Sequence, residues 1–167
     1  MRVFVLASKH RICMGRYFEE FVEGEVVDSG KRMITEGDVM NFAALTGDWN
    51  ELHTSDEFAR KNGFPQRIAH GAFIFAVSIG LLQSDSVRQP NLIALIGVDR
   101  LRFANPVLLG DTIRVRQTVR ALNPVNLQSG VLEAAAEVLN QNDAVTVSYL
   151  AKLLVRRSGK HWQHRLA

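Results

Sequence analysis

Three polar side chains able to hold a water or move a proton follow one another closely in the sequence: Asp48, Asn50 and His53. On an uninterrupted helix, the five-residue spacing from Asp48 to His53 would place them about 140° apart, on different faces. Gly47 is expected to end the helix before them, so an irregular turn can aim both side chains into one cleft. A carboxylate and an imidazole that hold one water can perform general acid–base chemistry, with Asn50 orienting either group. The spacing alone is explained more simply by an Asx turn with His53 at the surface.

A second candidate feature is the segment "IAHGAF", in which Gly71 precedes a long apolar run. At the N-terminus of a helix, the N–H groups of Gly71 and Ala72 would have no intrahelical acceptor. Such groups, with the helix dipole behind them, can stabilise a developing enolate or another oxyanion. Taken alone, the segment is more simply explained by a tight corner at Gly71 and a satisfied, partly buried histidine at position 70.

Helix signals surround the first of these features. Thr35 can cap a helix that has Asp38 at its third position, and Gly47 is the natural end of that helix. Ser55 is expected to cap a second, short helix that ends near Gly63. The first helix presents an apolar stripe made of Val39, Met40, Phe42, Ala43 and Leu45. The turn with the polar side chains therefore lies between two helices.

The remaining elements must provide the core. Residues 72–83 are apolar nearly all round, which predicts a helix buried on every side. Residues 24–35 are expected to form an early strand or an extended arm. Four further strands are expected as an antiparallel meander over residues 91–107, 111–122, 130–141 and 144–157. This layout predicts an α+β fold in which a curved sheet wraps round one long helix.

Two of these strand assignments depend on particular patterns. In residues 111–122 the side chains of Ile113, Val115, Val119 and Ala121 alternate with Arg114, Arg116, Thr118 and Arg120, as in a half-exposed strand. Residues 130–141 contain Ala, Leu and Glu, which favour helix. We predict a strand there because the segment lies between two strand patterns and its turns are short.

Composition limits the class of protein. The 167 residues are 47% hydrophobic and 22% charged, which is typical of a globular domain. We expect one domain over residues 15–157, after an N-terminal extension (1–14) and before a basic tail (158–167). The single cysteine, Cys13, excludes an intramolecular disulfide and fits a cytoplasmic protein. No Cys/His spacing suggests zinc and no apolar run suggests a membrane span, so we expect neither metal nor membrane.

The two polar segments together resemble one family. The MaoC-like dehydratases, which include the (R)-specific enoyl-CoA hydratases, share a pattern that this sequence matches at Phe42, Thr46, Gly47, Asp48, Asn50, Leu52, His53 and Ala59. Glu51 departs from it, because the family usually has proline there. The segment "FPQRIAHG" strengthens the resemblance, and "RFANPVLLGDTI" extends it more weakly. The resemblance covers roughly residues 17–156.

The resemblance implies a hot-dog fold and the reversible hydration of a trans-2-enoyl thioester to (R)-3-hydroxyacyl-CoA, with no metal or redox cofactor. By the same resemblance, Asp48 and His53 would activate the water and Asn50 would position them. The N–H of Gly71 would bind the thioester oxygen. Some short-chain hydratases have a serine on the long helix that reaches towards the site; here the helix offers Ser78 and Ile79, and Ser78 is the candidate substrate contact. Apart from the resemblance, Arg67 and Arg102, with Lys61 a weaker candidate, are expected to bind the CoA phosphates because they lie close in sequence to the two polar segments. A homodimer or a multiple of it is expected.

Other functions remain open at this point. A hot-dog thioesterase would also use a carboxylate to activate water, and a non-catalytic module could bind acyl-CoA without turnover. The net charge of +3 and the pI near 9.4 leave room for nucleic-acid binding. The basic residues are scattered along the chain and form no recognised motif, so we expect no nucleic-acid partner.

Overall fold

The long apolar helix is the centre of the fold. A computed structural model describes residues 16–83 and 91–158, and in it this helix is α4 (Gly71–Leu82). Its buried side chains are Phe73, Ile74, Val77, Ser78 and Leu82. Ala72, Ala76 and Gly80 are exposed in the single chain. The expectation of burial on every side is therefore wrong for one protomer, because the sheet covers only one side of α4.

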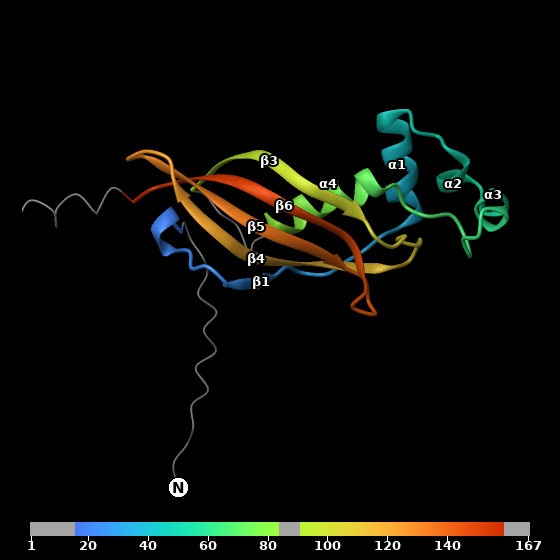
Figure 1. The fold of residues 1–167 in the computed structure, drawn as a ribbon. Helices are drawn as coiled ribbons and strands as arrows, with labels where there is room; N and C mark the ends of the chain where they lie inside the picture. Colours follow the sequence, from blue (N-terminus) through green and yellow to red (C-terminus); the bar gives the residue numbers. More distant parts are fainter. Residues whose placement is uncertain (1–15, 84–90, 159–167) are drawn as a thin grey trace, which may run out of the picture.

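The sheet that packs on α4 is antiparallel (Figure 1). Its strands are β1 (Val26–Asp28), β2 (Arg32–Met33), β3 (Leu92–Phe103), β4 (Thr112–Pro124), β5 (Ser129–Leu139) and β6 (Val145–Arg156). The early arm thus forms the two short strands β1 and β2, which both pair with β4. The α+β prediction is confirmed, and residues 130–141 contribute a strand as expected.

The order of the strands corrects the expected meander. Strands β4, β5 and β6 do follow one another, but β3 pairs with β6 at the far edge, in the order β1-β4-β5-β6-β3. The link between β3 and β4 is extended and has its own partners. The N–H of Ala69 donates to the carbonyl of Val107 at 2.8 Å, and Ile68 forms a bridge with Leu108. A link held in this way crosses the end of the sheet instead of closing a hairpin.

Two smaller expectations about side-chain direction are also corrected. The pairing of β4 with β5 is irregular between Val119 and Ala121, so the alternation shifts and Ala121 lies on the outer face beside Thr118 and Arg120. Leu45, assigned to the apolar stripe of the first helix, is 83% exposed. It lies on the side of that helix that faces away from the core.

Three short helices lie together beyond one end of the sheet (Figure 1): α1 (Glu36–Thr46), α2 (Glu51–Thr54) and α3 (Asp56–Lys61). The caps expected from the sequence are present. Thr35 and Asp38 form a reciprocal capping box, and Gly47 ends α1 in the left-handed region with φ 78°. Ser55 caps α3. A 3₁₀ turn, Phe18–Glu20, lies at the opposite end of the sheet.

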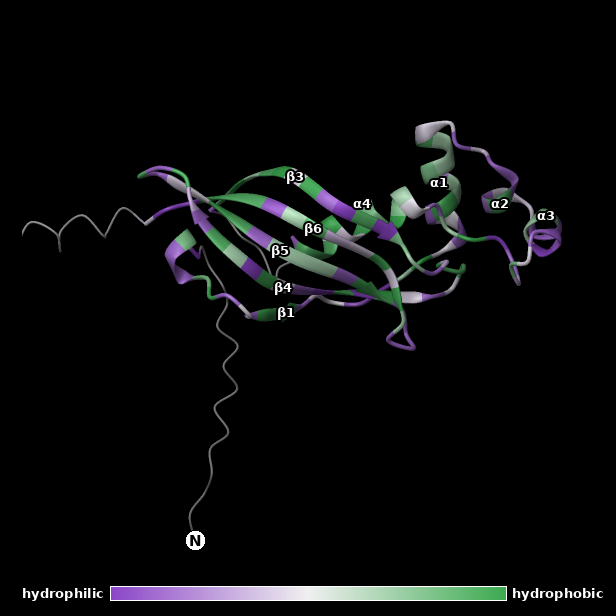
Figure 2. Ribbon diagram, viewed as in Figure 1, coloured by the Kyte–Doolittle hydropathy of each residue, from purple (hydrophilic) through white to green (hydrophobic). Residues whose placement is uncertain are grey.

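The core lies between α4 and the inner face of the sheet. Apolar and polar residues alternate along the strands (Figure 2), so one face of the sheet is apolar and packs on α4. A smaller apolar cluster under the 3₁₀ turn contains Phe18, Phe21 and Leu132. No helix in the described ranges combines the length and apolarity needed to cross a membrane. The predicted extension at residues 1–14 and most of the predicted tail at 158–167 lie outside the described residues.

Candidate active site

The turn between α1 and α2 is built by its own side chains. The carboxylate of Asp48 accepts a hydrogen bond from the N–H of Asn50 at 3.3 Å, and the side-chain oxygen of Asn50 accepts from the N–H of Leu52 at 2.9 Å. The simpler interpretation, an Asx turn, is therefore correct as local structure. It does not exclude a functional role, because Asn50 orients Asp48 through its backbone N–H while its side chain caps α2.

Glu51 takes the position where the family pattern has proline. It is the first residue of α2, a position whose N–H needs no intrahelical acceptor and where proline is favoured. A glutamate there also suits the helix, because its negative charge lies at the positive end of the helix dipole. The turn therefore forms without proline.

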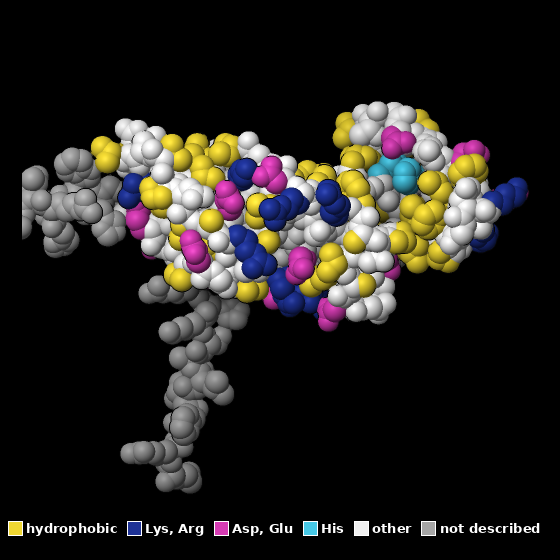
Figure 3. Space-filling view, viewed as in Figure 1, with side chains coloured by type: hydrophobic (Ala, Val, Ile, Leu, Met, Phe, Trp, Pro, Cys, Tyr) yellow, Lys and Arg dark blue, Asp and Glu magenta, His cyan; other side chains and the backbone are white. Residues whose placement is uncertain are grey.

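His53 has a defined tautomer. Its Nδ1 lies 2.8 Å from the backbone carbonyl oxygen of Ile68. A ring nitrogen that faces a carbonyl oxygen must carry the hydrogen, so the lone pair of the neutral ring is on Nε2. Since the ring is only half-buried, Nε2 can accept a proton from a bound water. Figure 3 shows histidine atoms at the surface beside the three short helices.

His70 joins this pair and was not singled out from the sequence as a site residue. It is 2% exposed, its Nε2 lies 3.0 Å from the carbonyl oxygen of Asp48, and its ring centroid lies 3.7 Å from that of His53. Burial lowers the pKa of His70, and the neighbouring His53 lowers it further. The sequence feature that could have identified His70 as a site residue is its position immediately before the glycine that begins a buried helix.

Asp48, His53 and His70 each offer a ligand atom within 4.8 Å of the others, a grouping that could hold a metal ion. No zinc spacing was visible in the sequence because the three come from two separate segments. One nitrogen of each histidine faces a backbone carbonyl oxygen, which leaves one nitrogen per ring as a potential ligand. The absence of a metal stays a prediction.

Gly71 lies close to a side chain of the sheet. It is the first residue of α4, so its N–H has no intrahelical acceptor, as expected. A Cβ at this position would lie 2.7 Å from a ring carbon of Phe103, at the end of β3. A side chain at position 71 would therefore force the ring of Phe103, which is 56% exposed, or the backbone beside it to move.

Comparison with known proteins decides the family. A profile of the MaoC like domain matches residues 18–142. The chain belongs to the MaoC-like domain family. It is 39% identical over 105 residues to Protein MaoC of Klebsiella aerogenes, with 63% of this chain and 31% of that protein covered. It is 35% identical over 109 residues to the (R)-specific enoyl-CoA hydratase of Rhodospirillum rubrum, with 65% and 72% covered. The chain thus spans about a third of the Klebsiella protein.

Solved structures agree with the family. The MaoC-like dehydratase from Rhodospirillum rubrum superposes with a TM-score of 0.78 at 26% identity, covering 86% of this chain and 98% of that one. A Mycobacterium tuberculosis protein described as a double hotdog fold superposes with a TM-score of 0.76 at 20% identity, covering 87% and 46%. The hot-dog fold and the family expected from the sequence are confirmed.

Two of the predicted substrate contacts of this MaoC-like domain, Arg67 and Lys61, already form ion pairs within the fold. Arg67 pairs with Glu36 at 2.9 Å and with Asp56 at 3.1 Å, and so ties α1 to α3. The hydrogen bond to Glu36 raises the pKa of Arg67, and the backbone N–H of Arg67 lowers the pKa of Asp56. Lys61 pairs with Glu57 on the same helix at 2.7 Å. Both candidates are already engaged within the fold.

Arg102 and Ser78 differ from that pair. Arg102 is exposed on β3 opposite Ser148, on the outer face where Lys and Arg side chains gather (Figure 3), and no acidic partner for it is found among the described residues. Ser78 is fully buried on the side of α4 that faces the sheet. Its hydroxyl donates to the carbonyl of Phe75 at 2.6 Å and lies 2.9 Å from the Tyr149 hydroxyl, so it faces the sheet.

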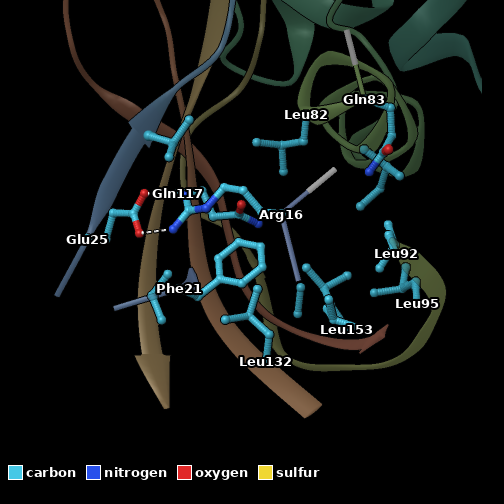
Figure 4. A pocket seen from close by; sticks show the side chains of 15 residues that line it. Arg16, Phe21, Glu25, Leu82, Gln83, Leu92, Leu95, Gln117, Leu132 and Leu153 are labelled. Atoms are coloured by element: carbon cyan, nitrogen blue, oxygen red, sulfur yellow. Dashed lines mark hydrogen bonds and ion pairs between the residues drawn. The ribbon is translucent and has the colours of Figure 1, made fainter. Parts of the chain in front are cut away.

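A mainly apolar cavity of about 70 Å³ lies at the other end of α4. Figure 4 shows side chains from α4, β3 and the N-terminal segment pointing into it. Its one ion pair joins Arg16 to Glu25 at 2.6 Å, and the hydrogen bond from Arg16 lowers the pKa of Glu25. Ile79 contributes to the wall from α4, so Ile79 and not Ser78 faces open space.

Proposed function

We propose that this MaoC-like domain catalyses the reversible addition of water to a trans-2-enoyl thioester, giving the (R)-3-hydroxyacyl thioester. The observation that carries the proposal is the tautomer of His53. Its hydrogen bond to the carbonyl of Ile68 leaves Nε2 as the basic nitrogen, close to the carboxylate of Asp48. An imidazole fixed in this way beside a carboxylate suits water activation.

In the proposed reaction, Asp48 and His53 hold one water. The base takes a proton as the water oxygen bonds to carbon 3 of the enoyl group, and the electron pair moves to the thioester oxygen. The N–H of Gly71, at the N-terminus of α4, stabilises that enolate oxygen. Carbon 2 then takes a proton as the carbonyl re-forms, so one water has been added. No metal or redox cofactor takes part.

The test is a turnover assay with enoyl-CoAs of different chain length and branching. Loss of the conjugated double bond without release of free CoA thiol is expected. Release of the thiol would instead indicate the thioesterase, and saturable binding without turnover of any substrate would indicate a binding module. Dialysis against a chelator should leave the rate unchanged, and a rate lost on dialysis and restored by a divalent cation would reject the metal-free mechanism.

We further propose a homodimer or a multiple of it, built on strand β3. This strand lies at the edge of the sheet and exposes Ile93, Leu95 and Ile96. An edge strand with exposed apolar side chains is a template for pairing with another chain. Light scattering should give at least twice the chain mass of 18.7 kDa, and Ile96→Lys should shift the population toward monomer. A wild-type monomer with full activity would contradict this proposal.

Among the predicted phosphate contacts, we expect Arg102 to bind the CoA phosphates, because Arg67 and Lys61 already have carboxylate partners. Arg102→Ala should raise KM several-fold at low salt, less at high salt, with kcat unchanged. Arg67→Ala is the matched comparison. It should lower Tm by loosening α1 from α3 and should leave KM unchanged. A KM that rises only in Arg67→Ala would reverse the assignment.

A further inference from the structure

His70 is the most buried polar group at the site, and it contacts both members of the proposed dyad. Its Nε2 lies 3.0 Å from the carbonyl oxygen of Asp48, and its ring lies against that of His53 with centroids 3.7 Å apart and planes 33° apart. Phe42 of α1 covers it from another side, with centroids 5.1 Å apart. Any displacement of His70 would therefore move the turn that holds Asp48, or the ring of His53, or both.

The hydrogen bonds of His70 define its protonation. Nε2 faces a carbonyl oxygen and so carries the hydrogen, which leaves the lone pair on Nδ1. Nδ1 is buried and finds no partner in the described part of the chain. A proton on Nδ1 would create a buried N–H without an acceptor, which is unfavourable. The neutral ring is the form that fits.

The charged or titratable groups that act on His70 are Asp48, from the turn after α1, and His53 of α2; the α1 neighbour Phe42 is apolar. Burial is the largest influence and lowers the pKa of His70, His53 lowers it further, and both the backbone and the charge of Asp48 oppose this. The electrostatics therefore agree with the hydrogen bonds. His70 stays neutral at pH values where an exposed histidine begins to take up a proton.

We propose that His70 is a positioning residue of the hydration site: its Nε2–H fixes the backbone of Asp48 and its ring supports the ring of His53, while His70 itself exchanges no proton with substrate. This inference rests on the proposed hydratase function and adds to it. A neutral, fully buried imidazole with its one hydrogen committed to a carbonyl holds the geometry of an exposed carboxylate in the turn after α1 and of a half-buried histidine on α2.

Two substitutions separate the two contacts. His70→Gln places an amide N–H where Nε2 was, so it keeps the donor to Asp48 and loses the stacked ring. His70→Phe keeps a ring against His53 and loses the donor. Each should lower kcat on the order of 10–100-fold, the size expected for misplaced catalytic groups, with KM changed less than about threefold.

Tyr149→Phe is the matched control. The Tyr149 hydroxyl is as buried as His70 and bonds to Ser78 under α4, away from the turn. Its removal should lower stability and leave kcat unchanged. The proposal is overturned if both His70 variants keep kcat within about twofold of wild type, or if Tyr149→Phe loses as much kcat as they do. If the wild-type protein shows no turnover, the proposed hydratase function is rejected, but the role of His70 is not. The role of His70 is then tested by a measurement that needs no substrate.

Histidine ¹⁵N NMR measures the tautomer and the protonation of His70 without substrate. The His70 signal is assigned by its loss in His70→Gln. The Nε2–H tautomer is expected, and its pKa should lie below that of a free histidine. Because the folded pKa is lowered, the unfolded chain binds more protons below its pKa of about 6.5, so stability should fall as the pH drops through this value. His70→Gln should weaken that fall. A His70 that carries its hydrogen on Nδ1, or takes up a proton as readily as a free histidine, overturns the proposal.

Discussion

Asp48→Asn is expected to lower the rate of hydration by roughly 10²–10⁴-fold, the usual contribution of general acid–base catalysis. The amide keeps the shape of the carboxylate and can still accept the hydrogen bond from the N–H of Asn50, so the turn should remain folded. It cannot take a proton from water. His53→Ala should cause a comparable loss, because it removes the basic nitrogen that the Ile68 carbonyl leaves free. Steady-state kinetics on an enoyl-CoA measure both losses.

The double variant distinguishes a shared role from two separate ones. If Asp48 and His53 activate one water together, the double variant should be little slower than either single variant. Glu51→Pro is the control within the same turn. Proline suits the first position of α2, so turnover should stay within a few-fold of wild type. The enzyme proposal fails if both single variants unfold while their folded fraction keeps its specific activity, because Asp48 and His53 would then be structural.

Gly71→Ala is expected to have the second largest effect, a loss on the order of 10²-fold in kcat, similar to that of a lost oxyanion-hole donor. The added methyl group would lie 2.7 Å from the ring of Phe103, so the ring, the start of α4 or the end of β3 must move. Movement of α4 takes the N–H of Gly71 away from the thioester oxygen. The affinity for substrate should change less than kcat, since the donor acts mainly on the enolate.

Two further variants test this cause. Gly37→Ala places a methyl group in the first turn of α1, where the nearest atom would be the Thr35 hydroxyl at 3.8 Å, and should not affect turnover. Combining Gly71→Ala with Phe103→Ala removes the clash and should restore part of kcat. A double variant as slow as Gly71→Ala alone would show that the contact with Phe103 is not the cause.

The elements around the site followed from local sequence signals. Thr35, Asp38 and Gly47 define α1 through hydrogen bonds within a few residues, so the sequence predicts both of its ends. The alternation in β4 as far as Val119 likewise depends on neighbouring residues, whereas the shift beyond it does not. These features need no knowledge of the rest of the fold, which is why they were predictable.

What could not be predicted depends on contacts between distant segments. The place of β3 beside β6 depends on the link after β3, which pairs with Ile68 and Ala69 about 40 positions earlier in the chain. The engagement of Arg67 depends on Glu36 and Asp56 from two other helices. His70 could not be assigned a role because burial and stacking are properties of the assembled site.

The position of β3 has a consequence for the order in which the chain can fold during synthesis. The turn after α1, α4 and β3 leave the ribosome early, but within the described sheet β3 pairs only with β6. Hairpins β4–β5 and β5–β6 can close as soon as they emerge, because their partners are adjacent in sequence. Phe103 therefore reaches its place against Gly71 only after β6 has been made. Nascent chains halted before residue 145 should carry every proposed catalytic residue and have no organised site.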